Sequence, residues 1–435
     1  MSTPYEPPSA SDSDRGNTPA TWFLAAGSAF AVYFCMYAFR KPFAAATYDN
    51  QTLSSLPLKS VLVLSQITGY LVSKFIGVKV VSELPRARRA IAILLLIGTA
   101  ELALVGFAFL PVPLKVVMLF LNGLPLGMVF GLVLSYLEGR RQTEALAAGL
   151  CASFIISSGV VKSVGQWLML THGVSEFMMP CVTGALFLPP LFLFVWLLQR
   201  TPEPGEQDRL IRSERRAMTG AERRTFFRTY SSGLILLLFV YSILTVTRTL
   251  RDDFGVEIWQ GLGVKEKPEV FGTSETIVGL VVTALNAFAI VFVRNIAALR
   301  AATGLMVVGF GIAIGATLIQ WQGELSAFWF MVLCGIGLYL PYVAFHTTIF
   351  ERIVAESDRP GNLGFLMYLA DSIGYLCYAG IIFADTLSRD QADQVNVLLF
   401  FQHSMLWGSL ISITALLAAL IYFQRRFAAD QTGSA

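Results

Sequence analysis

Long apolar runs separated by short polar segments make up most of the chain. An α-helix needs about 20 mostly apolar residues to cross the hydrocarbon core of a bilayer. The sequence predicts twelve such helices in two groups of six, over residues 22–48, 59–78, 90–111, 114–137, 145–170 and 177–199, and then 232–256, 272–293, 301–320, 327–350, 363–385 and 394–423. A transmembrane β-barrel would show short strands of alternating polarity instead. We therefore expect an all-α membrane protein.

The composition agrees with a lipid environment. Hydrophobic residues make up 55% of the 435 residues and charged residues only 14%, whereas a soluble domain has about 25% charged residues. The net charge of +3 is small and indicates no nucleic-acid partner. The five cysteines include no CxxC pair. The sequence therefore predicts neither a disulfide framework nor a metal site, and we expect no cofactor.

The placement of lysine and arginine predicts the orientation. Cytoplasmic loops of membrane proteins carry an excess of these residues, and here they concentrate on the side of the N-terminus, above all in segment 200–230. We therefore expect a multi-pass inner-membrane protein with both termini in the cytoplasm. Its expected parts are a disordered tail (1–20), a six-helix bundle (21–199), a cytoplasmic linker (200–230), a second bundle (231–425) and a short tail (426–435). We expect the linker to be solvated rather than to bind lipid headgroups.

The two groups of helices resemble each other. Arg40 follows Tyr33 in the first predicted helix at the same distance as Arg248 follows Tyr241 in the seventh. An offset of about 208 residues relates these pairs, and similar offsets recur at the start and end of the fourth and tenth predicted helices. Several matches at equivalent positions indicate two parallel six-helix repeats.

Charged residues inside the predicted helices are the main functional candidates. A charge at bilayer depth is costly and is usually retained for function or for pairing. The basic candidates, which we assign to substrate binding, are Arg40, Lys41, Lys74, Lys162 and Arg248. The other candidates are Glu101, Asp371 and His346.

Arg40 and Arg248 lie about 25 Å along their predicted helices at ~1.5 Å per residue. The internal symmetry would bring these two helices face to face, so that both guanidinium groups point at one site. Guanidinium groups bind phosphate or carboxylate through paired hydrogen bonds and keep their charge. We therefore expect a small anionic substrate, with Tyr33 and Tyr37 beside it to accommodate a sugar or glycerol moiety.

Structural roles are the alternatives for these cations. Arg40 and Lys41 could anchor the outer interface, and Lys74 could extend to the inner one. Arg248 could pair with Asp252, four residues further along the helix.

Carboxylates within the helices leave further alternatives open. Lys162 could form an ion pair with Asp371 or Glu101. Asp371 could carry a proton or serve as a counter-ion, whereas Glu101 and His346 are readily explained as structural residues. The residues that we assign to coupling or gating are Asp371, His346, Glu351 and Glu83.

Three segments resemble one branch of the major facilitator superfamily, the organophosphate:phosphate antiporters. They are YFCMYAFRKPFAAATY (33–48), GYLVSKFIGVKVVSELPRARR (69–89) and AFHTTIFERIVAESDRPGNLGFLMYLADSIGY (344–375). The resemblance implies the major facilitator fold, a monomer, and exchange of an organic phosphate for inorganic phosphate by alternating access. It assigns Arg40 and Arg248 to the substrate phosphate and Lys41 and Lys74 to accessory roles. The chain departs from this branch at Lys162, where a histidine is usual.

Two other functions remain in competition with exchange. One is a proton-coupled transporter of an organic acid or sugar acid, in which Asp371 would titrate. The other is a transporter-like sensor that signals through segment 200–230. An enzyme is not expected, because the sequence has no nucleophile elbow, no metal-ligand cluster and no phosphate-binding glycine loop.

Overall fold

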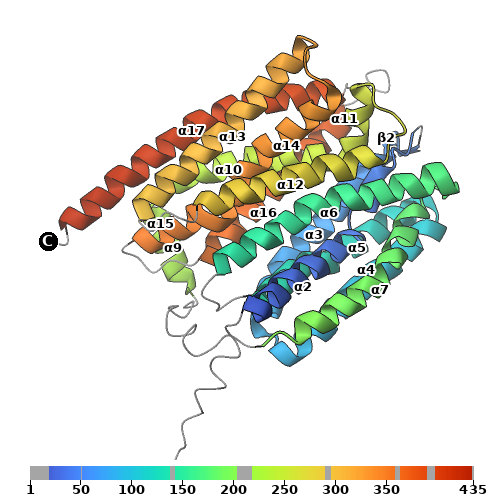
Figure 1. Cartoon of the computed structure of the whole chain (residues 1–435), viewed down its shortest axis with the longest axis horizontal. Helices are drawn as coiled ribbons and strands as arrows, with labels where there is room; N and C mark the ends of the chain where they lie inside the picture. The colour runs from blue at the N-terminus through green and yellow to red at the C-terminus, as the bar shows by residue number, and fades with distance from the viewer. Residues whose placement is uncertain are drawn as a thin grey trace, which may run out of the picture.

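The computed structural model describes residues 19–49, 51–137, 143–202, 218–289, 295–357, 363–388 and 397–433. Nearly all of the predicted N-terminal tail, and residues 203–217 of the predicted linker, lie outside these residues. The described chain forms two helical bundles that lie side by side (Figure 1). Ten of its helices are long and apolar enough to cross a membrane. The chain is thus a multi-pass membrane protein.

Six long helices make up the first bundle, and they agree with the predicted order. They are α2 (Pro19–Tyr37), α3 (Leu58–Glu83), α4 (Arg86–Phe109), α5 (Val112–Leu137), α6 (Thr143–His172) and α7 (Met179–Gln199). Short elements between α2 and α3 are the 3-10 helix η2 (Pro42–Ala45) and the hairpin of β1 (Thr52–Leu53) and β2 (Leu56–Pro57).

The second bundle repeats this plan with more interruptions. Its long helices are α10 (Ser231–Asp253), α12 (Glu269–Ala289), α13 (Asn295–Trp321), α14 (Ala327–Ala344), α16 (Leu363–Ser388) and α17 (Val397–Gly433). The short helix α9 (Gly220–Thr229) precedes α10, and α11 (Gly255–Gly261) follows it. A π-helical turn, η3 (Phe345–Ile349), joins α14 to α15 (Phe350–Glu356).

The first helix is shorter than the sequence pattern predicts. A continuous helix was expected over 22–48, but α2 ends at Tyr37. Arg40 and Lys41 lie in the turn that follows, where their backbone N–H groups both donate to the Tyr37 carbonyl. Pro42 explains the break, since proline has no N–H to donate within a helix. The predicted seventh helix likewise stops at Asp253, before α11.

Glycines allow α3 and α5 to pack with their backbones in contact. A Cβ atom added to Gly123 would lie 2.2 Å from the Gln66 carbonyl oxygen, and one added to Gly69 would lie 2.2 Å from the Phe120 carbonyl oxygen. Neither position has room for a side chain. The two bundles meet mainly where α6 packs along α12 (Figure 1) and where α3 packs against α16.

The close packing of α3 on α5 makes a stability test possible. We expect Gly123→Leu to lower the free energy of unfolding by about 1–3 kcal/mol or more, because overpacking forces the helices apart. Gly98→Leu is the matched control, since nothing lies within 4 Å of its added Cβ. Thermal unfolding in detergent measures both, and equal melting temperatures would contradict this account of the packing.

Candidate anion-binding site

Arg40 is buried in the turn after α2, although it lies outside any helix. Its guanidinium carbon lies 3.9 Å from the ring centroid of Tyr70 on α3 and 5.8 Å from that of Tyr37. Contact with a ring face stabilises a cation by about 0.5–2 kcal/mol, but it leaves the charge in place. Among the described residues, no carboxylate forms an ion pair with Arg40.

Arg248 on α10 has a similar environment in the second bundle. It is buried, and its guanidinium carbon lies 4.3 Å from the ring centroid of Tyr342. One terminal nitrogen donates weakly to the Tyr375 hydroxyl at 3.4 Å and to that of Thr249 at 3.5 Å. Its Nε atom is buried without a hydrogen-bond partner. No ion pair links Arg248 to a carboxylate in the described part of the chain.

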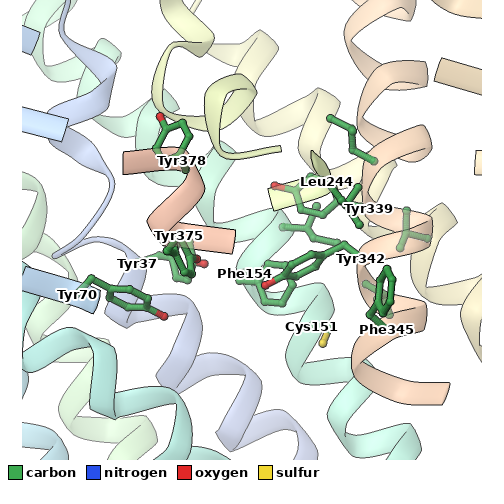
Figure 2. Packing of buried hydrophobic residues seen from close by; sticks show 14 of the residues in the cluster. Tyr37, Tyr70, Cys151, Phe154, Leu244, Tyr339, Tyr342, Phe345, Tyr375 and Tyr378 are labelled. Carbon is green, nitrogen blue, oxygen red and sulfur yellow. The ribbon is translucent and has the colours of Figure 1, made fainter. Parts of the chain in front are cut away.

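A pair of tyrosines connects the two arginines across the bundle interface. The ring centroids of Tyr70 and Tyr375 lie 5.4 Å apart. The Tyr70 ring contacts Arg40, and the Tyr375 hydroxyl accepts a hydrogen bond from Arg248. Tyr37 lies beside them in Figure 2. Tyr33 packs on Tyr37 at 5.5 Å, which extends the aromatic cluster along α2. Two cations, one from each repeat, therefore share one aromatic environment. Tyr70 was not among the sequence-predicted site residues, because helical periodicity alone does not distinguish it from a packing residue.

Lys41 and Lys162, two of the basic candidates from the sequence, are paired with carboxylates in the structure. Lys41 contacts Asp252 at 2.5 Å and Asp253 at 2.6 Å, and Lys162 contacts Asp252 at 2.5 Å. Ser158 also donates to the Asp252 carboxylate. The alternative pairing of Arg248 with Asp252 is therefore wrong. So is the pairing of Lys162 with an acid on α4 or α16.

Three consecutive charges at the end of α10 build this cluster. Successive helical residues point about 100° apart, so Arg251, Asp252 and Asp253 face different neighbours. Arg251 pairs with Glu275 of α12 at 2.6 Å, and the Asp253 carboxylate accepts a hydrogen bond from Tyr378 at 3.1 Å. Of this run, only Asp252 was considered from the sequence, as a partner of Arg248, although three consecutive charges at a predicted helix end were a visible signal.

A second link between the bundles lies further along α3. Lys74 forms an ion pair with Asp371 of α16 at 3.1 Å, and Asp371 also accepts a hydrogen bond from the Tyr241 hydroxyl. The Tyr241 oxygen lies 3.5 Å from His346 Nε2, and His346 lies in the π-helical turn η3. Such turns are frequent at functional sites. Asp371 is thus a counter-ion of Lys74, within reach of groups that can exchange a proton.

The remaining candidates lie elsewhere. Glu101 on α4 faces α7, where an added Cβ on Gly184 would lie 2.1 Å from its Oε2. Glu351 is the second residue of α15, and Glu83 is the last residue of α3. Their predicted part in gating stays a prediction.

Comparison with protein families supplies a relationship for nearly the whole chain. The model of a family of unknown function, DUF5690, matches residues 42–426. The chain belongs to this family. A search of curated proteins found no match.

Several solved transporter structures share the fold of this DUF5690 protein. A D-xylose–proton symporter aligns with a TM-score of 0.62 and 15% identity, over 92% of this chain and 96% of its own. A bacterial homologue of the human lysosomal transporter Spinster aligns with a TM-score of 0.59 and 13% identity, over 95% and 99%. A peptide transporter of the POT family gives 0.57 and 13%, over 94% and 97%. The twelve-helix major facilitator fold is therefore confirmed.

The shared carboxylate at the α10 end is open to a direct test. We expect Asp252→Asn to lower the free energy of unfolding by about 3–5 kcal/mol, because it leaves Lys162 buried without a counter-charge. The double variant Asp252→Asn with Lys162→Gln should recover much of this loss, since it removes the excess charge as well. Thermal unfolding of both variants measures the coupling. A double variant no more stable than the single one would contradict the pairing.

Proposed function

We propose that the protein is a secondary transporter of a small anionic metabolite, and that this substrate is an organic phosphate. The observation that carries the proposal is the contrast among the buried cations. At the bundle interface, Lys41, Lys59, Lys74 and Lys162 each pair with a carboxylate, whereas Arg40 and Arg248 have none among the described residues. Within the first bundle, buried Lys115 also lacks a carboxylate partner among the described residues, but its ammonium group donates to the carbonyl oxygens of Phe107 and Ala108. An uncompensated buried charge typically costs about 3–5 kcal/mol. A site that keeps two such charges is suited to an anion.

The charge and geometry of the arginines favour a phosphate ester over a single carboxylate. A phosphate monoester carries about −1.5 to −2 charge at pH 7 and offers three acceptor oxygens. It could therefore neutralise both guanidinium groups at once through charge-assisted hydrogen bonds. The tyrosine hydroxyls around the arginines would suit a hydroxylated organic moiety.

The same electrostatics favours exchange over one-way transport. A carrier whose site is empty would have to change conformation with two buried positive charges. Inorganic phosphate would neutralise them on the return step, so that each organic phosphate moves against one phosphate ion. With both termini in the cytoplasm, the Lys41–Asp252 cluster would close the outer side, and its ion pairs would separate when the site opens outward.

Ligand-induced stabilisation tests the anion site. We expect phosphate and phosphate esters to raise the unfolding free energy by about 2.7 kcal/mol at a hundredfold excess over the dissociation constant. Arg40→Gln and Arg248→Gln should each remove the effect. The exposed Arg300 on α13 provides a control, Arg300→Gln, that should keep it. Stabilisation by neutral sugars alone, or phosphate stabilisation that survives in both site variants, would count against the proposal.

Proton coupling is the second candidate, and the Asp371 environment is what favours it. We expect labelled phosphate to exchange against internal phosphate ester in proteoliposomes at the same rate with and without a pH gradient. Uptake of an organic acid or sugar acid that requires the gradient, and that Asp371→Asn abolishes, would establish the alternative instead. Net flux in either assay would exclude a protein that acts only as a sensor.

A further inference from the structure

An apolar groove opens on the lateral face of the second bundle, and neither Arg40 nor Arg248 lines it. It has a volume of about 630 Å³ and lies between α10, α16 and α17. Bulky side chains form its walls, among them Ile235, Phe239 and Ile411, and these are about half exposed on the lateral face of the bundle. Exposed Cys377 of α16 also lines it.

The groove follows from the small residues on the facing helices. At Gly408 the backbone of α17 comes so close to α10 that an added Cβ would lie 2.9 Å from Ile243 Cγ2. Ser404 and Ser242 line the same space with short side chains. On α10 the lining extends from Ile235 to Thr247, about 18 Å at 1.5 Å per residue. This length is close to half of a ~30 Å hydrocarbon core.

One end of the groove reaches a basic helix. Phe227 of α9 is the lining residue at that end. Arg223 and Arg224 lie four and three residues before Phe227, so helical geometry places all three on one face. Both arginines are exposed. Two positively charged side chains, Arg223 and Arg224, therefore lie at the end of the apolar groove.

The basic helix is held firmly in position. A capping box between Thr219 and Glu222 fixes its start, with hydrogen bonds of 3.2 and 2.7 Å. Phe226 is buried and packs on Tyr230 at 5.2 Å, and Tyr230 in turn contacts Phe427 of α17 at 6.0 Å. α9 thus lies fixed at one end of the bundle (Figure 1).

We propose that this groove and the arginines of α9 form a binding site for one anionic phospholipid. An acyl chain would lie between α10, α16 and α17, and the headgroup phosphate would contact Arg223 and Arg224. The charge of the helix argues for an anionic lipid over a zwitterionic one, since each basic residue near an anionic lipid surface contributes about 1 kcal/mol. The lipid would add to the contacts that already hold α9 against the second bundle.

Native mass spectrometry of the purified full chain with phosphatidylglycerol or phosphatidylcholine tests the site. We expect phosphatidylglycerol to be retained more strongly, and Arg223→Gln with Arg224→Gln to weaken it about 30-fold. The control, Arg88→Gln with Arg300→Gln, removes the same charge from other exposed positions and should bind as the wild type does. The measured quantity is lipid retention and does not involve the proposed substrate. The result therefore tests the lipid site independently of the transport assays.

A second pair of variants separates the groove from surface attraction. Cys377→Trp should fill the groove and reduce phosphatidylglycerol binding, whereas Leu376→Trp, on the neighbouring exposed residue, should not. Equal retention of both lipids would overturn the proposal. So would loss of binding in the arginine variant alone, which would indicate only headgroup attraction, and so would a lipid-poor dimer, which would indicate that a second copy covers the groove.

Discussion

The cost of placing charge in a low-dielectric interior governs the arrangement of this protein. Each buried lysine at the bundle interface meets a carboxylate, and one carboxylate, that of Asp252, serves both Lys41 and Lys162. Ion pairs of this kind contribute little net stability, since desolvation offsets much of the attraction. Removing one partner is nevertheless strongly destabilising. Charge matching therefore determines how the two bundles fit together more than it adds to the stability of their interface.

The two bundles divide the charges unequally. The lysines at the interface come from the first bundle, and their carboxylate partners come from the second, at Asp252, Asp253, Glu257 and Asp371. Complementary charge fixes the register of one surface on another and disfavours other alignments. Arg40 and Arg248 break this pattern, since one comes from each bundle and neither has an acidic partner among the described residues. The site therefore follows from what the interface leaves unpaired.

The sequence was sufficient for the fold but only partly sufficient for the site. Apolar runs longer than a bilayer is thick leave few options for the backbone, and the repeated position of Arg40 and Arg248 pointed to their related environments. Ion-pair partners were not accessible in this way. Which of Arg251, Asp252 and Asp253 faces Lys162 depends on the rotation of α10 against α6 and α12, and several rotations are compatible with the same hydrophobic pattern. Pro42 was a signal in the sequence that the first helix ends early. The apolar residues that follow Pro42 nevertheless led to the prediction of one continuous helix.

Marginal ion pairs are suited to a protein that must open on alternate sides. The pairs at Asp252 join α10 to the turn after α2 and to Lys162 of α6, and the Lys74–Asp371 pair joins α3 to α16. If each pair were strongly stabilising, one conformation would dominate, and an anion at the arginines would have too little differential affinity to shift the equilibrium. Because the cost of desolvation nearly balances the attraction within each ion pair, water can replace the Asp252 pairs or the Lys74–Asp371 pair when the bundles separate there. Under the proposed transport of an anion, the charge of the substrate would neutralise the two arginines and so allow the bundles to move.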